Sequence, residues 1–180
     1  MCLDGYLGCI FPDLTQLSLA MPAHSSADLD SFDLAILDIL QRDNTIAQRE
    51  IARQVHLSAP AVQRRIKRLR ESGVIRAEVA VLDPTRLGRP LTLTVEVHLH
   101  DENPEHTAGM RERIRAEPAV QQCYSITGEA DYLLVVTAST MDDYEALVAR
   151  LFGGDSNVRR FRTSVALGCL KAGFHVPLSA

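Results

Sequence analysis

The chain has 180 residues, of which 46% are hydrophobic, and its formal net charge is -4. This length suits one large or two small domains, and the apolar content is enough for a core in each. The four cysteines form no close pair and no metal-ligand spacing, which indicates reduced thiols and argues against a disulfide-stapled secreted protein.

Residues 1–28 follow no sustained helical or strand period. Asp4 and Asp13 interrupt their apolar content and no basic region precedes it, which argues against a secretion signal and a membrane span. Two interpretations stay open. The segment is an N-terminal extension that is disordered or binds a partner, or the start is misassigned and translation begins at Met21.

Residues 29–82 predict a three-helix unit. The first helix is expected over Asp30 to Gln41, with Asp30 as its N-cap, and the second over about Ala47 to Gln54. A third helix of about four turns begins at the Ser58 cap and ends at Gly73. Because only a tight turn separates the last two helices, the pattern is typical of a helix-turn-helix that inserts its second helix into a DNA groove.

The third helix combines an apolar stripe with a cationic face. Val62, Ile66 and Leu69 recur at i, i+4 and i+7, and basic side chains occupy the other positions. Residues 30–76 carry nine Lys and Arg against six Asp and Glu, whereas residues 77–180 carry ten against fourteen. We therefore expect DNA contact only in the first domain. The predicted DNA-binding residues are Ser58, Ala59, Gln63, Arg64, Arg65, Lys67, Arg68 and Arg70.

The position along the helix suggests different roles for these residues. Those from Ser58 to Arg64 lie near the helix start and are expected to read the groove, and the later cations to bind phosphates or pack. Arg65 suits an ion pair with an earlier helix as well as a phosphate. A solvated cationic face with no partner is the alternative for the whole helix.

A wing or short strand at Val74 to Leu82 and a hinge at residues 83–90 lead into a second domain at residues 91–172, followed by a tail at residues 173–180. Apolar and polar residues alternate over Leu91 to His100, which indicates a strand with one buried face. The further elements are expected as a helix at 103–117, strands at 120–126 and 132–138, a helix at 140–152 and a strand at 158–167. This βαββαβ order predicts an α+β protein in which a winged helix-turn-helix precedes a ferredoxin-like sandwich. Its uncovered sheet face favours a dimer.

The pattern over about residues 29–172 resembles the leucine-responsive/asparagine regulator (Lrp/AsnC, feast-famine) family. The segments that carry the resemblance are Leu29-Asp30 with Asp33 and Ile36-Leu37, Glu50-Ile-Ala52, Leu57-Ser58 with Val62, Arg65-Ile66 and Leu69, Gly73-Val-Ile75, and Gly128-Glu-Ala-Asp-Tyr-Leu-Leu134. The resemblance implies an amino-acid-sensing second domain and dimers that often assemble further into octamers. Two recognition helices related by the two-fold axis of a dimer are expected to read a pseudo-palindromic DNA site.

The turn from Gly128 to Asp131 is the candidate effector site. Glycine lets a ligand approach the backbone, free N–H groups can hold a carboxylate, and Asp131 can pair with an ammonium group. A plain hairpin turn is the alternative. The resemblance adds the last strand, and the predicted effector residues are Gly128, Glu129, Asp131, Tyr132, Arg162 and Thr163. Glu129 and Phe161 depart from the usual aspartate and threonine of the family, which leaves the ligand's identity open.

Two further departures lie in the first domain. Ala47 replaces the usual hydroxyl cap of the second helix, and His56 replaces the glycine of the interhelix turn, where we expect a positive φ. His56 is interpreted as a solvated turn residue, with a phosphate contact as the alternative. His98 and His100 are interpreted as polar-face residues of a sheet or of an interface, rather than as metal ligands together with His106.

The sequence thus predicts a cytoplasmic, nucleoid-associated transcriptional regulator that binds double-stranded DNA sequence-specifically and is modulated by a small amino acid. No catalytic residue, metal, cofactor or membrane contact is predicted. One alternative is a haem-pathway decarboxylase, whose family is similar in architecture. The other is a DNA-compacting protein with low sequence preference.

Overall fold

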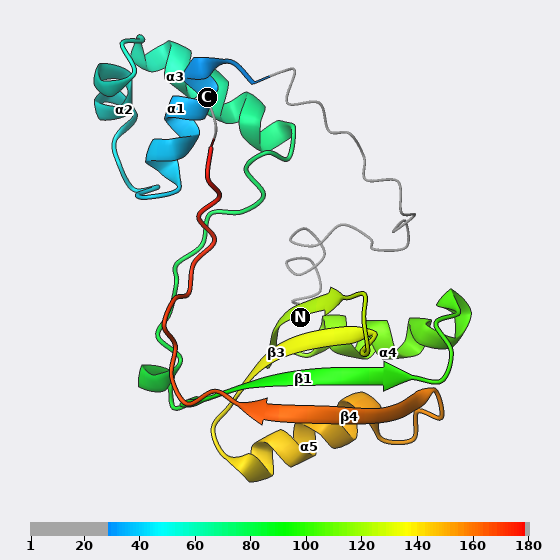
Figure 1. Ribbon diagram of the computed structural model, residues 1–180. Coiled ribbons are helices and arrows are strands. Elements are labelled where there is room, and N and C mark those ends of the chain that lie inside the picture. The colour runs from blue at the N-terminus through cyan, green and yellow to red at the C-terminus, as the bar shows by residue number, and fades with distance from the viewer. Residues whose placement is uncertain (1–28, 179–180) are drawn as a thin grey trace, which may run out of the picture. The chain divides into compact units, whose positions relative to one another are not determined.

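The structure, a computed structural model, describes residues 29–178. The predictions for residues 1–28 lie outside the described residues. The described chain forms two compact units (Figure 1), one of residues up to 80 together with those from 172 onward, and one of residues 81–171. The tail predicted at residues 173–180 therefore belongs, as far as it is described, to the first unit.

The first unit contains three helices, α1 (Ser31–Leu40), α2 (Gln48–Gln54) and α3 (Ala59–Glu71). A capping box starts α1, because Asp33 N–H donates to the Asp30 carboxylate at 2.9 Å and Asp30 N–H donates to the Asp33 carboxylate at 3.2 Å. These two bonds satisfy backbone donors that the first helical turn leaves free. The predicted cap of α1 is confirmed.

The predicted third helix is also confirmed. The Ser58 hydroxyl accepts the N–H of Ala61 at 3.4 Å, and Gly73 follows the helix with a φ of 75°. The apolar stripe of α3 packs on the other two helices. The core of the unit consists of Ile36, Ile51, Ala52, Val55, Val62 and Ile66.

The two irregularities that the sequence predicts lie at the two ends of α2. Ala47 gives α2 no side-chain cap. His56 has a φ of 56°, and no other non-glycine residue of the described chain has a positive φ. The cost of that conformation is about 1–2 kcal/mol for a residue with a Cβ.

The short strand predicted as one option for Val74 to Leu82 is wrong. The structure has no strand there, and Val79 and Val81 are exposed. A strand needs a neighbour to satisfy its backbone groups, and none is paired with this segment in the described part of one chain. Its β-branched residues indicated an extended backbone without indicating a partner.

The second unit confirms the predicted βαββαβ order. After a short 3₁₀ turn (Thr85–Leu87), its elements are β1 (Leu91–Leu99), α4 (Pro104–Ala116), β2 (Val120–Ser125), β3 (Tyr132–Ala138), α5 (Met141–Phe152) and β4 (Val158–Val165). The strands pair antiparallel in the order β2-β3-β1-β4. The α+β fold class is therefore confirmed.

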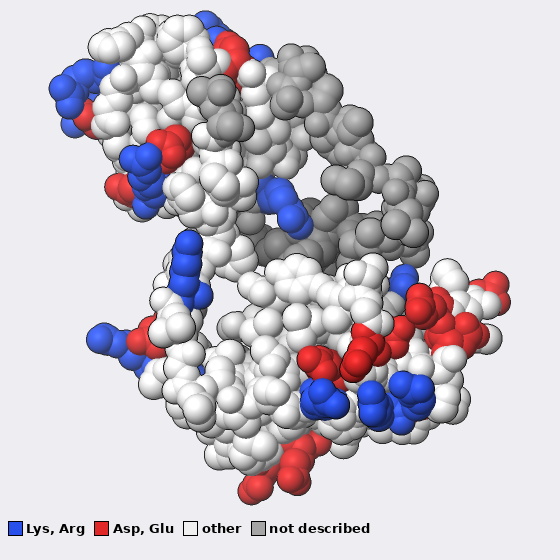
Figure 2. Space-filling model, viewed as in Figure 1, with Lys and Arg blue, Asp and Glu red and all other residues white. Residues whose placement is uncertain are grey.

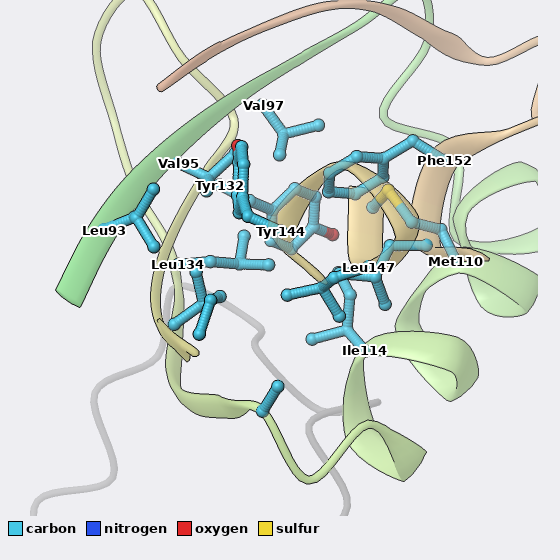
Figure 3. Packing of buried hydrophobic residues seen from close by; sticks show 14 of the residues in the cluster. Leu93, Val95, Val97, Met110, Ile114, Tyr132, Leu134, Tyr144, Leu147 and Phe152 are labelled. Atoms are coloured by element: carbon cyan, nitrogen blue, oxygen red, sulfur yellow. The ribbon is translucent and has the colours of Figure 1, made fainter. Parts of the chain in front are cut away.

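The core of the second unit lies between the sheet and its two helices (Figure 3). Leu93, Val95 and Val97 alternate along β1 and are almost fully buried, as the pattern of β1 predicts. The residues that they pack with include Met110 and Ile114 of α4, Leu134 of β3, and Tyr144 and Leu147 of α5. The two helices thus cover one face of the sheet.

The other face of the sheet carries the intervening side chains. In the register, Thr94 of β1 stands beside Val135 of β3 and Ser164 of β4, and Glu96 stands beside Leu133 and Arg162. We call this the open face. It combines apolar side chains of intermediate burial, such as Leu133 and Val135, with polar ones, and no helix of its own unit packs on it.

Candidate DNA-binding helix and effector loop

Only some of the predicted cationic side chains of α3 are both exposed to solvent and free of an ion pair with the described residues. Val62, Ile66 and Leu69 are buried, and the positions between them hold polar side chains. Gln63 and Arg64 are exposed, and the described residues give Arg64 no ion pair. These two side chains lie one turn from the helix start, where a recognition helix contacts base edges.

Two of the predicted DNA contacts instead bind an acid of α1. The Asp33 side chain is fully buried and accepts hydrogen bonds from Arg65, at 2.8 Å, and from Arg68. Arg65 also pairs with Asp30 at 2.7 Å and lies over the ring of Phe32, 5.5 Å from its centroid. These hydrogen bonds, to Asp33 first and then to Asp30, raise the pKa of Arg65 above its ordinary value.

A buried carboxylate needs such partners, because a single unpaired charge in the interior is strongly unfavourable. Arg65 and Arg68 therefore join α3 to the start of α1. For Arg65 the sequence offered this ion pair as one of two options, and for Arg68 it offered a phosphate contact or packing. Sequence reasoning missed that a single acid, Asp33, receives both guanidinium groups, although its i, i+3 spacing from the Asp30 cap was visible.

The remaining cations of α3 have partners of different strength. A guanidinium nitrogen of Arg70 lies 2.8 and 2.9 Å from the two carboxylate oxygens of Glu78. Lys67 is 3.7 Å from Glu71 and both side chains are exposed, which makes this a weak pair. Of the predicted set, Ser58 serves as the cap and Ala59 opens the helix. Arg49, in the first turn of α2, is a further exposed cation that the predicted set does not include. A cation at a helix N-terminus opposes the helix dipole, and this is the signal in the sequence that could have drawn attention to it.

The predicted effector loop is tied to β1 by backbone and carboxylate bonds. Gly128 has a φ of 129°, which only glycine adopts readily. Asp131 N–H donates to the Val97 carbonyl at 2.9 Å, and the Asp131 carboxylate accepts the N–H of Leu99 at 2.7 Å. The carboxylate that was predicted to pair with an ammonium group is therefore also part of the loop's own structure.

His98 supports the same loop from the sheet. It is 2% exposed, its Nδ1 lies 2.7 Å from the Glu129 carbonyl oxygen, and its Nε2 has no hydrogen-bond partner in the described residues. The prediction of His98 as a polar-face residue is therefore wrong, because its side chain is buried and its ring is bonded to the loop. His100 is exposed, and His106 pairs with Asp101 at 2.6 Å.

One chain does not bring all six predicted effector residues together. Tyr132 faces the helices, where its hydroxyl accepts a hydrogen bond from Arg111 at 2.8 Å. Thr163 also faces the helices and shares a short hydrogen bond with the Tyr144 hydroxyl. Arg162 lies on the open face, 3.9 Å from Glu96. Strand β1 separates β4 from β3, so the last strand is two strand spacings, about 10 Å, from the strand that follows the loop.

Two shallow hollows of the second unit lie away from the loop. The first, of about 500 Å³, is lined by residues that include Arg89, Thr137 and Arg150. The second, of about 560 Å³, lies along α5 and β4 and includes Phe152 and Phe161. Neither lining includes a residue of the loop from 128 to 131, so a ligand held by this loop needs a further wall.

Among residues 29–178, no three His, Cys, Asp or Glu side chains are grouped so that they could hold a metal ion. Burial raises the pKa of the Cys123 thiol to about 11, and Cys169 is exposed.

No helix of the described chain is long and apolar enough to cross a membrane. Figure 2 shows Asp and Glu side chains gathered along one side of the second unit, in agreement with its acidic sequence.

Comparison with known proteins identifies both units. Residues 29–76 match the model of a winged helix-turn-helix DNA-binding domain, and residues 92–175 match the Lrp/AsnC ligand binding domain. An HTH-type transcriptional regulator of Sinorhizobium fredii is 39% identical, covering 84% of this chain and 89% of the relative. The leucine-responsive regulatory protein of Rhizobium meliloti is 31% identical, covering 80% of this chain and 92% of the relative.

Solved structures give the same result. An AsnC family transcriptional regulator from Agrobacterium tumefaciens has a TM-score of 0.77 and 32% identity, over 83% of this chain and 97% of the other. A transcriptional regulator from Neisseria meningitidis, solved as a complex with L-Met, has a TM-score of 0.76 and 27% identity, over 83% and 96%. The chain therefore belongs to the Lrp/AsnC family of transcriptional regulators.

Proposed function

We propose that this regulator reads DNA with Gln63 and Arg64 of α3, and that Lys67 and Arg49 bind phosphates beside them. The observation that carries the proposal is the exposed, unpaired Arg64 on a helix whose neighbouring arginines are bound to Asp33 and Glu78. Membership of a family of transcriptional regulators favours this function over the decarboxylase alternative. A protein that binds chromosomal DNA acts in the cytoplasm at the nucleoid, which is the location we propose.

The test begins with selection of fragmented genomic DNA by the purified protein. A specific regulator enriches a pseudo-palindromic sequence, whereas uniform recovery of all fragments supports the compaction alternative instead. Failure to retain any DNA at low salt contradicts both DNA-binding functions.

The enriched sequence then allows the individual arginines to be compared. Removing a side chain that neutralises a phosphate reduces the slope of log affinity against log salt by about 0.9, whereas removing a base contact weakens binding without that change in slope. We expect Arg64→Ala to weaken binding at every salt concentration. Arg70→Ala is the matched control, because Arg70 lies on the same helix but is paired with Glu78. Equal losses in both variants contradict the proposed division.

We further propose that a small amino acid binds at the loop from Gly128 to Asp131. The loop supplies a glycine with a positive φ and an acid, and the L-Met complex of the Neisseria meningitidis regulator supports an amino acid as the ligand class. Because one chain leaves the loop open and holds Arg162 two strands away, a second copy of the protein is expected to complete the site.

Thermal unfolding of the full chain with each of the twenty amino acids tests this site. A ligand that binds only the folded protein raises the melting temperature with concentration. We expect one or a few amino acids to do so, and the rise to shrink in Glu129→Ala but not in Glu145→Ala, an exposed acid of α5. The effector proposal fails when no amino acid changes the melting temperature.

The proposed assembly is a homodimer through the open face, with octamers as a further stage. Leu133 and Val135 are only half-buried there in one chain, and covering them with a second copy removes apolar surface from water. Two recognition helices related by a two-fold axis then contact half-sites about one helical turn apart.

A further inference from the structure

The C-terminal tail is bound to helix α1 by one side chain, Gln41. The Gln41 side-chain amide accepts the N–H of Val176 at 3.0 Å and donates to the Val176 carbonyl oxygen at 3.1 Å. The same amide nitrogen lies 3.4 Å from Nε2 of His175. An amide that pairs with both the donor and the acceptor of one residue resembles a single rung of an antiparallel ladder. The two residues are 135 positions apart in sequence.

Gln41 is well placed to hold this segment. It is the C-cap of α1, and its own N–H donates to the Leu37 carbonyl at 3.0 Å, so its backbone is fixed by the helix. The tail contributes little burial of its own, because Phe174 is 78% exposed and Val176 is 61% exposed. The contact therefore depends on directional hydrogen bonds rather than on apolar packing, and a change at Gln41 should release the segment without removing part of a core.

This contact changes how the first unit is connected to the second. The first unit consists of two separate pieces of chain, residues up to 80 and residues from 172 onward. One piece leads into β1 and the other follows β4, whose end is fixed to the sheet by the Ala166 N–H that donates to Thr92 at 2.9 Å. The two units are thus joined by two covalent connections, one of which depends on the bonds to Gln41.

We infer that Gln41 is a positioning residue for DNA binding, which ties the C-terminal tail to the DNA-binding unit and so restricts the rotation of that unit relative to the second. We call the DNA-binding unit of each copy its head. A head held to the second unit by one connection samples more orientations than a head held by two. When two heads bind one DNA, the restriction raises the effective concentration of the second head at its half-site. This inference depends on the proposed two-headed mode of binding.

The first measurement is hydrogen exchange of the C-terminal peptide in the full-length protein. In the wild type the Val176 amide is expected to exchange slowly, because its N–H is bonded to Gln41. Gln41→Ala removes both bonds and should make this amide exchange as fast as in an unstructured peptide. Gln41→Glu keeps an acceptor for the N–H but loses the donor to the carbonyl, and should give an intermediate rate. Gln121→Ala, an exposed glutamine of β2, is the matched control and should leave the rate unchanged.

The second measurement compares affinity for DNA with one half-site and with two. We expect Gln41→Ala to weaken binding to two half-sites by about fivefold or more, and to leave binding to one half-site and the melting temperature unchanged. A role confined to stability would lower both affinities together. The Glu variant should again be intermediate.

The outcomes separate the inference from the function on which it depends. Fast exchange at Val176 in the wild type, or slow exchange in Gln41→Ala, shows that Gln41 does not hold the tail and overturns the inference. Release of the tail with no change on two half-sites overturns its role in positioning. A wild-type protein that binds one and two half-sites equally contradicts the two-headed mode, whatever the exchange rates show.

Discussion

Asp33 determines which arginines of α3 are free. Its side chain is fully buried and is bonded to Arg65 and Arg68, whereas Arg64 extends into solvent. We predict that Arg65→Ala lowers the free energy of unfolding by about 2 kcal/mol, because it leaves a buried carboxylate short of a partner. Arg64→Ala should change it by no more than about 0.5 kcal/mol.

Urea denaturation of the two variants provides the measurement, and their affinity for specific DNA at one fixed salt concentration provides the opposite ranking. If Arg64→Ala is as destabilising as Arg65→Ala, the division into structural and DNA-contacting arginines fails. The residue pattern alone could not make this division, because all the cations of α3 are basic in the sequence and only the positions of Asp33 and Glu78 in the structure distinguish them.

The thiols provide a second comparison between single residues. Burial raises the pKa of Cys123 to about 11, so at pH 8 its thiol stays protonated, whereas Cys169 is exposed. Because the thiolate is the reactive form, we predict that iodoacetamide modifies Cys169 quickly and Cys123 only after unfolding. Peptide mass spectrometry after timed alkylation at pH 8 distinguishes them. Comparable rates for both cysteines in the folded protein would show that Cys123 is more accessible than its burial indicates.

At the scale of elements, α2 is the helix with a missing cap. Ala47 has the extended backbone of an N-cap residue but gives no side-chain hydrogen bond to the first turn. We predict that Ala47→Ser raises the free energy of unfolding by about 1 kcal/mol, because its hydroxyl can accept a free N–H of α2. Chemical denaturation measures the change, and Ala149→Ser on the exposed side of α5 is the control that should give no gain. Loss of stability in Ala47→Ser would mean that the hydroxyl cannot reach the helix.

The elements differ in how far their sequences predict them. Caps and periodicity are local signals, so α1 from its Asp30 cap and α3 from Ser58 to Gly73 are found where the sequence places them. Alternation likewise predicts β1, because one of its faces packs on helices. The segment from 74 to 82 has the composition of a strand but no partner, and pairing is not a local property.

The same distinction applies to the candidate sites. Gly128 and Asp131 identify the loop from sequence, since a turn needs residues of these types. The bond from Gln41 to the tail joins positions 135 apart and has no periodic or compositional signal. The hydrogen bond from the Leu99 N–H to the Asp131 carboxylate also has no periodic or compositional signal. Such contacts depend on the three-dimensional path of the chain and become visible only in the structure.

At the scale of the whole molecule, we predict that assembly through the open face is coupled to DNA binding. Val135 lies in the middle of that face, beside Thr94 of β1 and Gln122 of β2. We predict that Val135→Asp converts the proposed dimer to a monomer, because a buried carboxylate in a sheet-to-sheet contact has no partner and is strongly unfavourable. Sedimentation measures the mass, and Ala149→Asp on the exposed side of α5 should retain the wild-type mass.

The consequence for DNA follows from the separation of charge between the units. Residues 30–76 are net basic and residues 77–180 are net acidic, so each first unit must provide its own attraction to DNA. A monomeric Val135→Asp variant should therefore bind one half-site as well as the wild type does. It should lose the gain that a second half-site gives, because that gain comes from linking two heads. A monomer that still prefers two half-sites would show that the heads cooperate through the DNA and not through the open face.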